Sequence, residues 1–437
     1  MGKTFYGNEI FSSTANSSTP KKLMREPPPA LYRPGDTGVP GYCRPSPGLR
    51  PCQNSEPHFA GWYARAFSKL ISYSMTQELL AILVVLLTII SAHAKTEFGK
   101  LEGAEFRIDV PANWNHGLVV YCHGYDPHAG GVGYDPAKPL PPELSVFVKA
   151  GYALIQSGYS AGGWALEQAI PDIEALRSYF VEKYGPPKET FITGHSLGGL
   201  LTVAILEKSP EPYDAGLDLC GVIGSATRVL TQAFDSRVLF DYYFPGALPS
   251  PAKVPKDYEV TDPLTKKVYD RLRAKPQAAA AVRKLASVRT DKDLASGLVF
   301  GTYVLKDIEQ RAGGNPFDNR DTIYTGTADD NALNDGVKRY AADPGALTYL
   351  ERYQTLTGHL TRPVLAIHTT YDPLVPPVVP NNYSLLTRES GTGDLFVQQY
   401  VKHDGHCNIT AEETERGFNE LRHWKQTKRA PKAGWLH

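Results

Sequence analysis

The stretch Gly194–Gly199 reads GHSLGG and matches the pattern Gly-x-Ser-x-Gly around Ser196. This pattern is typical of a serine on a sharp turn from a strand to a helix, where glycines avoid collisions with neighbouring elements. The flanking sequence fits, because residues 190–193 predict a strand and residues 197–208 predict a helix. A helix that begins beside the serine also favours developing negative charge there. Ser196 is therefore the candidate nucleophile.

A second match to the same pattern lies upstream. Gly158–Gly162 reads GYSAG, and it too follows a predicted strand and precedes a predicted helix. Local sequence alone does not separate Ser160 from Ser196.

A serine hydroxyl is a weak nucleophile at neutral pH and needs an imidazole to take its proton and a carboxylate to orient the imidazole. Asp372 follows a predicted strand at 363–368 and is flanked by prolines, which predicts the orienting acid or, alternatively, a simple Asp-Pro turn. His403 and His406 follow the next predicted strand, 395–401. We favour His406 as the base, because Gly405 lets the loop turn toward the site. Asp404 is then a loop residue.

Two backbone N–H groups should stabilise an oxyanion. One belongs to Leu197, directly after the serine, and the other to Tyr125, which follows His123-Gly124 after the predicted strand 117–122. His116, His123 and His128 have no usual spacing for a zinc site, so we expect no metal.

Taken together, the segments HGY, GHSLGG, TTYDPLVP and DGHC resemble secreted serine esterases and lipases of the α/β-hydrolase fold, over about 105–225 and 362–427. The resemblance implies a mostly parallel central sheet flanked by helices, acyl transfer in two steps, and no cofactor. In that fold a helix, a strand and a second helix separate the oxyanion strand from the nucleophile strand. Counted from the predicted strand 117–122, Ser196 follows the strand that carries the nucleophile in that fold, and Ser160 follows the strand before it. Gly-His is the usual form of the base, which favours His406.

The chain is also partly similar to tannases and feruloyl esterases. In those families a cysteine directly before the serine bonds a cysteine directly after the histidine. Here Cys407 follows His406, but His195 precedes Ser196. Cys122 or Cys220 could pair with Cys407 instead, or all three could stay reduced as buried thiols. The sequence leaves these alternatives open.

Short apolar runs alternate with amphipathic stretches from Lys95 onward, and the regular alternation stops between about 226 and 361. We interpret residues 95–437 as one catalytic domain with a lid-like insertion at 226–361 that sets substrate choice. Trp164 is a candidate wall of the substrate pocket. The remaining predicted elements are strands at 106–110, 152–156 and 217–223, and helices at 166–184, 263–287, 343–353 and 411–427.

The N-terminal part has a different texture. Residues 79–90 read LLAILVVLLTII and are followed by an Ala92-x-Ala94 pattern, which predicts a signal peptide at 75–94 cleaved after Ala94 and a secreted or periplasmic protein. Residues 1–74 are then a non-native or disordered upstream extension. The alternative is a membrane anchor formed by 79–90.

Composition narrows the function further. The 437 residues carry 46 basic and 46 acidic side chains, so no net charge attracts nucleic acid or a stable membrane partner. Five cysteines are too few for a disulfide scaffold. The leading prediction is a secreted carboxylic ester hydrolase acting on small-molecule or polymer-derived esters. The alternatives are a serine peptidase of the same fold and a non-catalytic binding protein that retains the fold.

Overall fold

The computed structural model describes residues 94–127, 130–224 and 226–436. All of these residues belong to one compact unit of the chain. The predicted upstream extension and the predicted signal segment up to residue 93 lie outside the described residues. Within the described ranges, no helix has the length and apolar character needed to cross a bilayer.

Nine strands form one mixed sheet in the order β1-β2-β4-β3-β5-β6-β7-β8-β9. The strands β1 and β2 pair antiparallel, as do β2 and β4, and every later pair is parallel. This strand order, with a helix after most parallel strands, is the predicted α/β-hydrolase fold. The strands are β1 (Lys95–Leu101), β2 (Ala104–Val110), β3 (Gly117–Cys122), β4 (Ala153–Ser157), β5 (Glu189–His195), β6 (Ala215–Leu219), β7 (Val364–Tyr371), β8 (Phe396–Asp404) and β9 (Gly434–Trp435).

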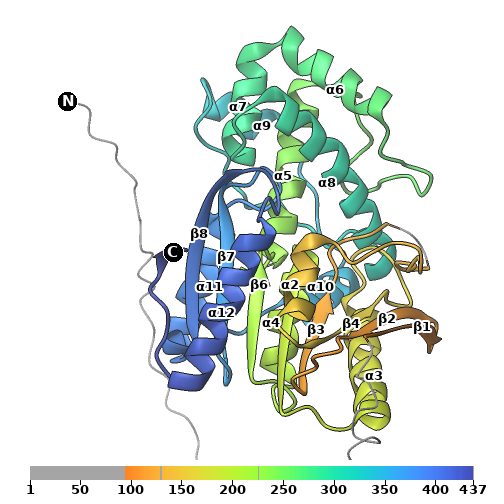
Figure 1. Ribbon diagram of the computed structural model, residues 1–437. Coiled ribbons are helices and arrows are strands. Elements are labelled where there is room, and N and C mark those ends of the chain that lie inside the picture. The colour runs from red at the N-terminus through yellow and green to blue at the C-terminus, as the bar shows by residue number, and fades with distance from the viewer. Residues whose placement is uncertain (1–93, 128–129, 225, 437) are drawn as a thin grey trace, which may run out of the picture. The chain divides into compact units, whose positions relative to one another are not determined.

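Helices cover both faces of the sheet (Figure 1). The helices α3 (Leu166–Tyr184), α4 (Leu197–Lys208) and α11 (Val378–Glu389) pack into one hydrophobic cluster with the sheet. The helices α2 (Pro142–Lys149) and α12 (Ala411–Thr427) pack into the other. Along β3, Leu118 and Val120 belong to the first cluster and Val119 to the second. Side chains that alternate between two apolar layers explain why the strand is hydrophobic throughout.

Between β6 and β7 the described residues form helices and loops but no strand. These are α5 (Ala226–Tyr243), α6 (Asp262–Ala274), α7 (Pro276–Ala286), α8 (Asp291–Ala312), α9 (Asp330–Gly336) and α10 (Pro344–Gln354). We call this segment, 226–361, the helical insertion. Its helices α5 to α9 gather beyond the end of the sheet at which the parallel strands finish (Figure 1). The lid-like role of the insertion stays a prediction.

Two predicted elements differ from the structure. The predicted strand 217–223 ends at Leu219, because Cys220 adopts a φ of 52°, which is incompatible with a strand. The apolar residues after it, Val222 and Ile223, are buried in a loop. The predicted helix 263–287 is two helices, because Pro276 begins a new one and ends the first at the preceding turn.

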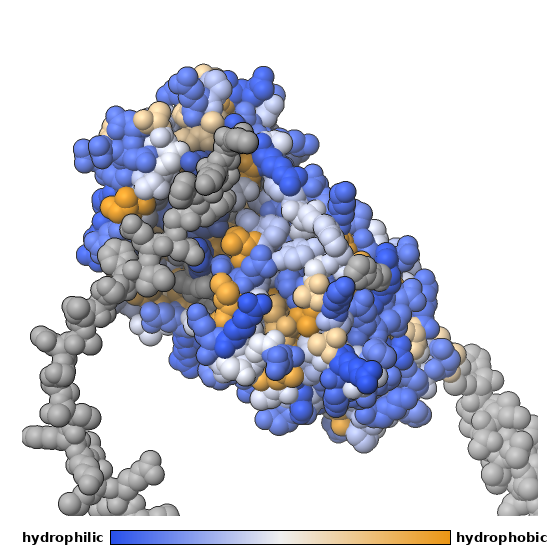
Figure 2. Space-filling model, turned by 90° about the vertical axis from the view of Figure 1, so that its left-hand side faces the viewer, coloured by the Kyte–Doolittle hydropathy of each residue, from blue (hydrophilic) through white to orange (hydrophobic). Residues whose placement is uncertain are grey.

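Of the described residues visible in Figure 2, most are hydrophilic, and hydrophobic ones form small groups among them. Six large hydrophobic residues of the described chain are exposed, and only Val378 and Leu385, both on α11, share an element: Val260, Ile323, Leu347, Val378, Leu385 and Trp435. Scattered residues of this kind are normal for a protein surface.

Candidate active site

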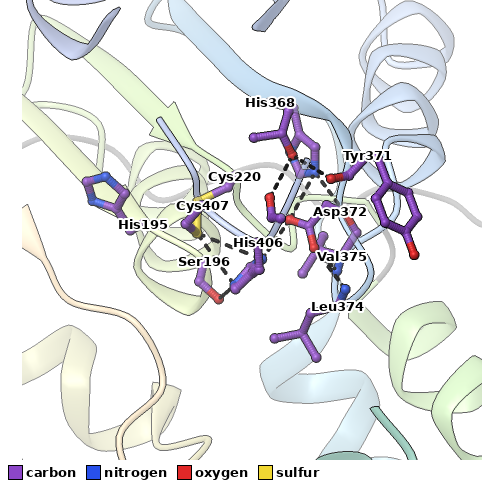
Figure 3. The surroundings of a disulfide bond; sticks show 12 residues. His195, Ser196, Cys220, His368, Tyr371, Asp372, Leu374, Val375, His406 and Cys407 are labelled. Carbon is purple, nitrogen blue, oxygen red and sulfur yellow. Dashed lines mark hydrogen bonds and ion pairs between the residues drawn. A yellow bond between two sulfur atoms is a disulfide. The ribbon is translucent and has the colours of Figure 1, made fainter. Parts of the chain in front are cut away.

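Ser196, His406 and Asp372 form a continuous hydrogen-bonded chain (Figure 3). The Oγ of Ser196 lies 2.8 Å from the Nε2 of His406, and the Nδ1 of His406 lies 2.6 Å from the Oδ2 of Asp372. In the tautomer that satisfies both bonds, the serine hydroxyl donates to Nε2 and the N–H at Nδ1 donates to the carboxylate. The structure thus brings together three residues that are 176 and 34 positions apart in sequence.

The backbone at Ser196 is held in a rare conformation. Ser196 joins β5 to α4 with a φ of 56° and a ψ of −118°, outside the usual regions for a residue with a side chain. Its N–H donates to the carbonyl of Leu219 at 3.0 Å, which ties the turn to the neighbouring strand. A Cβ placed at Gly194 or Gly198 would overlap backbone atoms of the same turn or of Cys122. The two flanking glycines are therefore required by close packing, as the sequence pattern predicts.

Asp372 is completely buried just past the end of β7. Its Oδ1 accepts hydrogen bonds from the N–H groups of Leu374 and Val375, both at 2.8 Å, so the residue caps its own turn as well as binding His406. Burial pushes the pKa of Asp372 upward, but the hydrogen bond and charge of His406 and the amide of Val375 outweigh it. The net effect lowers the pKa, and the carboxyl stays ionised.

His368 is a neighbour of this acid that the sequence did not single out. It is fully buried on β7, with its Nε2 2.8 Å from the carbonyl of Val375 and 3.6 Å from the Oδ2 of Asp372 (Figure 3). Burial lowers its pKa, with only partial opposition from the charge of Asp372. A neutral His368 therefore donates to Val375 and braces the loop that presents the acid. Its only sequence signal is a histidine inside an otherwise apolar strand.

The loop that carries His406 is fastened by a disulfide. Gly405 has a φ of 114° and Cys407 a φ of 54°, so the chain turns sharply on both sides of the histidine. Cys407 is bonded to Cys220, which directly follows β6 (Figure 3). Cys122 is a free, buried cysteine. Of the alternatives left open by the sequence, the structure has the Cys220–Cys407 pair.

His195 stands where the tannase-like pattern has a cysteine, and it is not part of the hydrogen-bonded chain. Burial and the nearby charge of His406 lower its pKa to about 4, so it stays neutral at ordinary pH. Its Nδ1 lies 3.2 Å from the hydroxyl of Tyr121. The sulfur that bonds Cys407 therefore comes from the neighbouring strand end.

The competing residues lie with other partners. Ser160 hydrogen-bonds Asp172 through both its N–H, at 2.7 Å, and its hydroxyl, at 2.8 Å. His403 lies 3.0 Å from the Oε1 of Glu413. Asp404 forms an exposed ion pair with Arg289. The geometry thus favours Ser196 and His406 as the pair that can exchange a proton.

Leu197 and Tyr125, the predicted oxyanion donors, line the same cavity as Ser196 and His406. Leu197 is the first residue of α4, where an N–H has no acceptor within the helix. A Cβ added at Gly124 would lie 3.5 Å from the Cβ of Ser196, so the backbone that leads into Tyr125 runs against the nucleophile. The role of the two N–H groups as oxyanion donors stays a prediction.

The cavity has a volume of about 310 Å³ and lies between the ends of the parallel strands and the helical insertion. Trp164, the predicted pocket wall, lines it and is 6% exposed. The N–H of Trp164 donates to Asp307 of α8 at 2.5 Å. The described residues contain no group of three or more metal-ligating side chains, and His128 lies outside them.

Comparisons with known proteins give similarity in structure only. No family model matches the sequence, and no curated protein does. Among solved structures, a puromycin-hydrolysing peptidase of Mycobacterium tuberculosis has 14% identity and a TM-score of 0.42 over 79% of this chain and 42% of that chain. An esterase of Pyrococcus furiosus has 13% identity and a TM-score of 0.40 over 79% and 93%. Est1E from Butyrivibrio proteoclasticus, also solved with ferulic acid bound, has 13% identity and a TM-score of 0.40 over 76% of this chain and 99% of that chain. The chain thus spans less than half of the peptidase.

Proposed function

We propose that this protein is a serine hydrolase that cleaves carboxylic esters, with Ser196 as nucleophile, His406 as general base and acid, and Asp372 as the orienting carboxylate. The observation that carries the proposal is the hydrogen-bonded chain from Ser196 Oγ through His406 to the buried Asp372. An imidazole that accepts from a serine hydroxyl on one side and donates to a carboxylate on the other is the arrangement that activates serine.

The reaction follows from these contacts. Ser196 Oγ attacks the ester carbonyl while Nε2 of His406 takes the hydroxyl proton, and Asp372 stabilises the imidazolium that forms. The N–H groups of Leu197 and Tyr125 bind the negative oxygen of the tetrahedral intermediate. His406 then returns the proton to the departing alcohol, leaving an acyl-enzyme. Water, deprotonated by His406, releases the acid and restores Ser196.

The test is turnover of p-nitrophenyl acetate and of an aminoacyl anilide by the wild-type protein and by Ser196→Ala, Ser160→Ala and His403→Ala. We expect Ser196→Ala to lower kcat on the ester by about 10⁴-fold or more, and the other two variants to keep activity within a few-fold. Activity that survives Ser196→Ala and disappears in Ser160→Ala would reverse the assignment. Cleavage of the anilide but not the ester would favour a peptidase. If the folded protein turned over neither compound, a binding protein would be favoured.

The site of action is part of the proposal. We infer that the protein works outside the cytoplasm, after cleavage at Ala94. Two observations support this: the apolar segment 79–90 in the sequence, and the Cys220–Cys407 disulfide, a bond that persists mainly in oxidising compartments. N-terminal sequencing of protein recovered from the culture medium or periplasm should give Lys95 as the first residue. A product that retains residues 1–94 in the membrane fraction would support the anchor instead.

A further inference from the structure

The helix α8 carries two glycines, Gly297 and Gly301, that its own backbone does not need. Both lie inside a 22-residue helix, and neither has a positive φ. Glycine in a helix interior costs about 1 kcal/mol relative to alanine. A Cβ at Gly297 would meet nothing within 4 Å, and one at Gly301 would meet only the Cβ of Ala233 at 3.7 Å, an ordinary contact. Close packing therefore does not explain why these positions lack side chains.

Both glycines line the cavity that contains Ser196. Gly301 is buried, yet a Cβ there would meet only the Cβ of Ala233. Ala233 of α5 lies opposite, so two small residues from facing helices together keep that part of the cavity open. The missing side chains act as free volume in the wall of the candidate site.

Most side chains of the described lining are apolar, and Asp293 is its one carboxylate. Leu230, Leu298, Val304, Leu374 and Val375 line the same cavity as the glycines. The described lining contains no lysine or arginine that could bind an anionic group.

The polar side chains of the lining already have partners within the protein. Ser236 donates to the carbonyl of Gln232, Gln232 donates to the carbonyl of Leu285, and Asp293 accepts from the hydroxyl of Tyr371. A ligand in this space is therefore recognised by burial of hydrocarbon.

We infer that the cavity between α5 and α8 binds the acyl chain of a neutral, medium-chain ester; this rests on the proposed function. The acyl group is favoured over the alcohol because the alcohol must leave and water must enter before deacylation, whereas the acyl group stays bound to Ser196 throughout. A cavity of about 310 Å³ lies at the small end of the range for ligand pockets. We therefore expect an acyl chain of medium length to fill it.

The experiment measures kcat/KM for two matched ester series. One series is p-nitrophenyl acetate, butyrate, octanoate and dodecanoate, in which only the acyl chain grows. The other is the acetates of ethanol, butanol and octanol, in which only the alcohol grows. Burial of a methylene contributes up to about fourfold, so we expect kcat/KM to rise by roughly 30-fold or more from acetate to octanoate. It should then stop rising at dodecanoate, and the alcohol series should stay within a few-fold.

Gly301→Leu tests the wall itself, with Ser296→Leu as the matched control, because Ser296 is exposed on the same helix and outside the cavity. Gly301→Leu should lower the ratio of kcat/KM for octanoate to kcat/KM for acetate by about 30-fold or more, and Ser296→Leu should leave both values unchanged. Gly297→Leu provides a second filling variant if Gly301→Leu does not fold.

The possible failures are distinguishable. Equal turnover of acetate and octanoate by the wild type, or loss of octanoate preference in Ser296→Leu as well, would overturn the acyl pocket and leave the proposed function intact. A length preference in the alcohol series alone would assign the cavity to the leaving group and overturn the inference. If the folded wild type turns over no ester, the proposed function falls and the acyl pocket falls with it.

Discussion

The carboxyl ends of the strands and the helical insertion both line one cavity, but they are held by different kinds of contact. At the strand ends the backbone decides: the N–H of Ser196 bonds the carbonyl of Leu219, and Gly198 has no room for a Cβ against Cys122. In the insertion, side chains decide. The guanidinium of Arg237 alone joins Thr302, Asp241 and the carbonyl of Pro249.

This difference indicates which part of the molecule can change its amino-acid sequence and keep its structure. A backbone contact constrains the sequence to glycine or to one turn type, and it therefore leaves a motif that can be recognised. A side-chain network can be rebuilt from other residues, and it leaves no fixed pattern. Substrate choice, which the insertion controls in our proposal, accordingly lies where the sequence is least constrained.

The largest expected effect comes from breaking a backbone contact. Gly198→Ala places a Cβ in steric overlap with the backbone carbonyl of Cys122. Neither the turn at Gly198 nor the backbone at Cys122 can move without displacing Ser196. We expect it to lower the free energy of unfolding by about 3 kcal/mol or more and to abolish activity. Denaturant unfolding followed by circular dichroism measures the change.

Gly345→Ala is the matched control in the insertion. Gly345 lies in the first turn of α10, its φ is not positive, and a Cβ there would meet nothing within 4 Å. This variant should be neutral or slightly stabilising. If both glycine variants cost the same, the contrast between backbone-held and side-chain-held regions is wrong.

The next effect concerns the network of the insertion. The side chain of Arg237 is 1% exposed, and Arg237→Ala leaves Asp241 and the carbonyl of Pro249 without their donor. Removing one partner of a buried pair is strongly destabilising, so we expect a loss of about 3 kcal/mol. Arg320→Ala, which removes an exposed pair with Asp318, should leave the unfolding midpoint unchanged.

Turnover of an ester also distinguishes the insertion from the strand ends. Because Arg237 lies in the insertion, the fraction of Arg237→Ala that remains folded should keep turnover of p-nitrophenyl acetate within a few-fold of the wild type. Loss of acetate turnover in folded Arg237→Ala would show that the insertion also holds the hydrogen-bonded chain at Ser196.

The smallest effect depends on pH. Burial raises the pKa of Glu309, on α8, to about 7, although the N–H of Val254 donates to it at 2.9 Å. The folded protein therefore holds a proton that the unfolded chain releases near pH 4.5, and the stability this gives is lost as the pH rises through 7. Glu309→Gln, which stays neutral, should be more stable than the wild type at pH 8 by about 1–2 kcal/mol, a figure reduced for partial exposure. The gap should close toward pH 5.

Exposed Glu412 provides the control, and Glu412→Gln should show the same pH dependence as the wild type. Unfolding midpoints measured from pH 5 to pH 8 decide the question. A constant difference between Glu309→Gln and the wild type across this range would contradict a raised pKa for Glu309.

The sequence predicts the sheet, and with it the proximity of the three candidate site residues, for a physical reason. Ser196, Asp372 and His406 each follow a parallel strand, and carboxyl ends of parallel strands meet at one edge, so correct strand order places them together. The helices α3, α4 and α12 show an apolar face or clear end signals, and their predicted bounds agree with the structure. The catalytic roles of Ser196, Asp372 and His406 stay predictions.

What the sequence did not predict has equally definite causes. The helix α8 contains Gly297 and Gly301, which lower helix propensity at the positions that border the cavity. The overlong strand at 217–223 arose because Val222 and Ile223 are buried as a loop, and burial alone does not distinguish a loop from a strand. The choice between Cys122 and Cys220 depended on which strand end lies beside Cys407, a matter of tertiary structure.

The disulfide described at the site has a consequence for limited proteolysis. Cys220 and Cys407 are 187 residues apart, and the whole helical insertion lies between them. A protease that cuts anywhere in 226–361 therefore yields two fragments, one with Ser196 and one with His406, that remain a single covalent molecule. On a denaturing gel the nicked protein would run as one band until a reductant separates it into two.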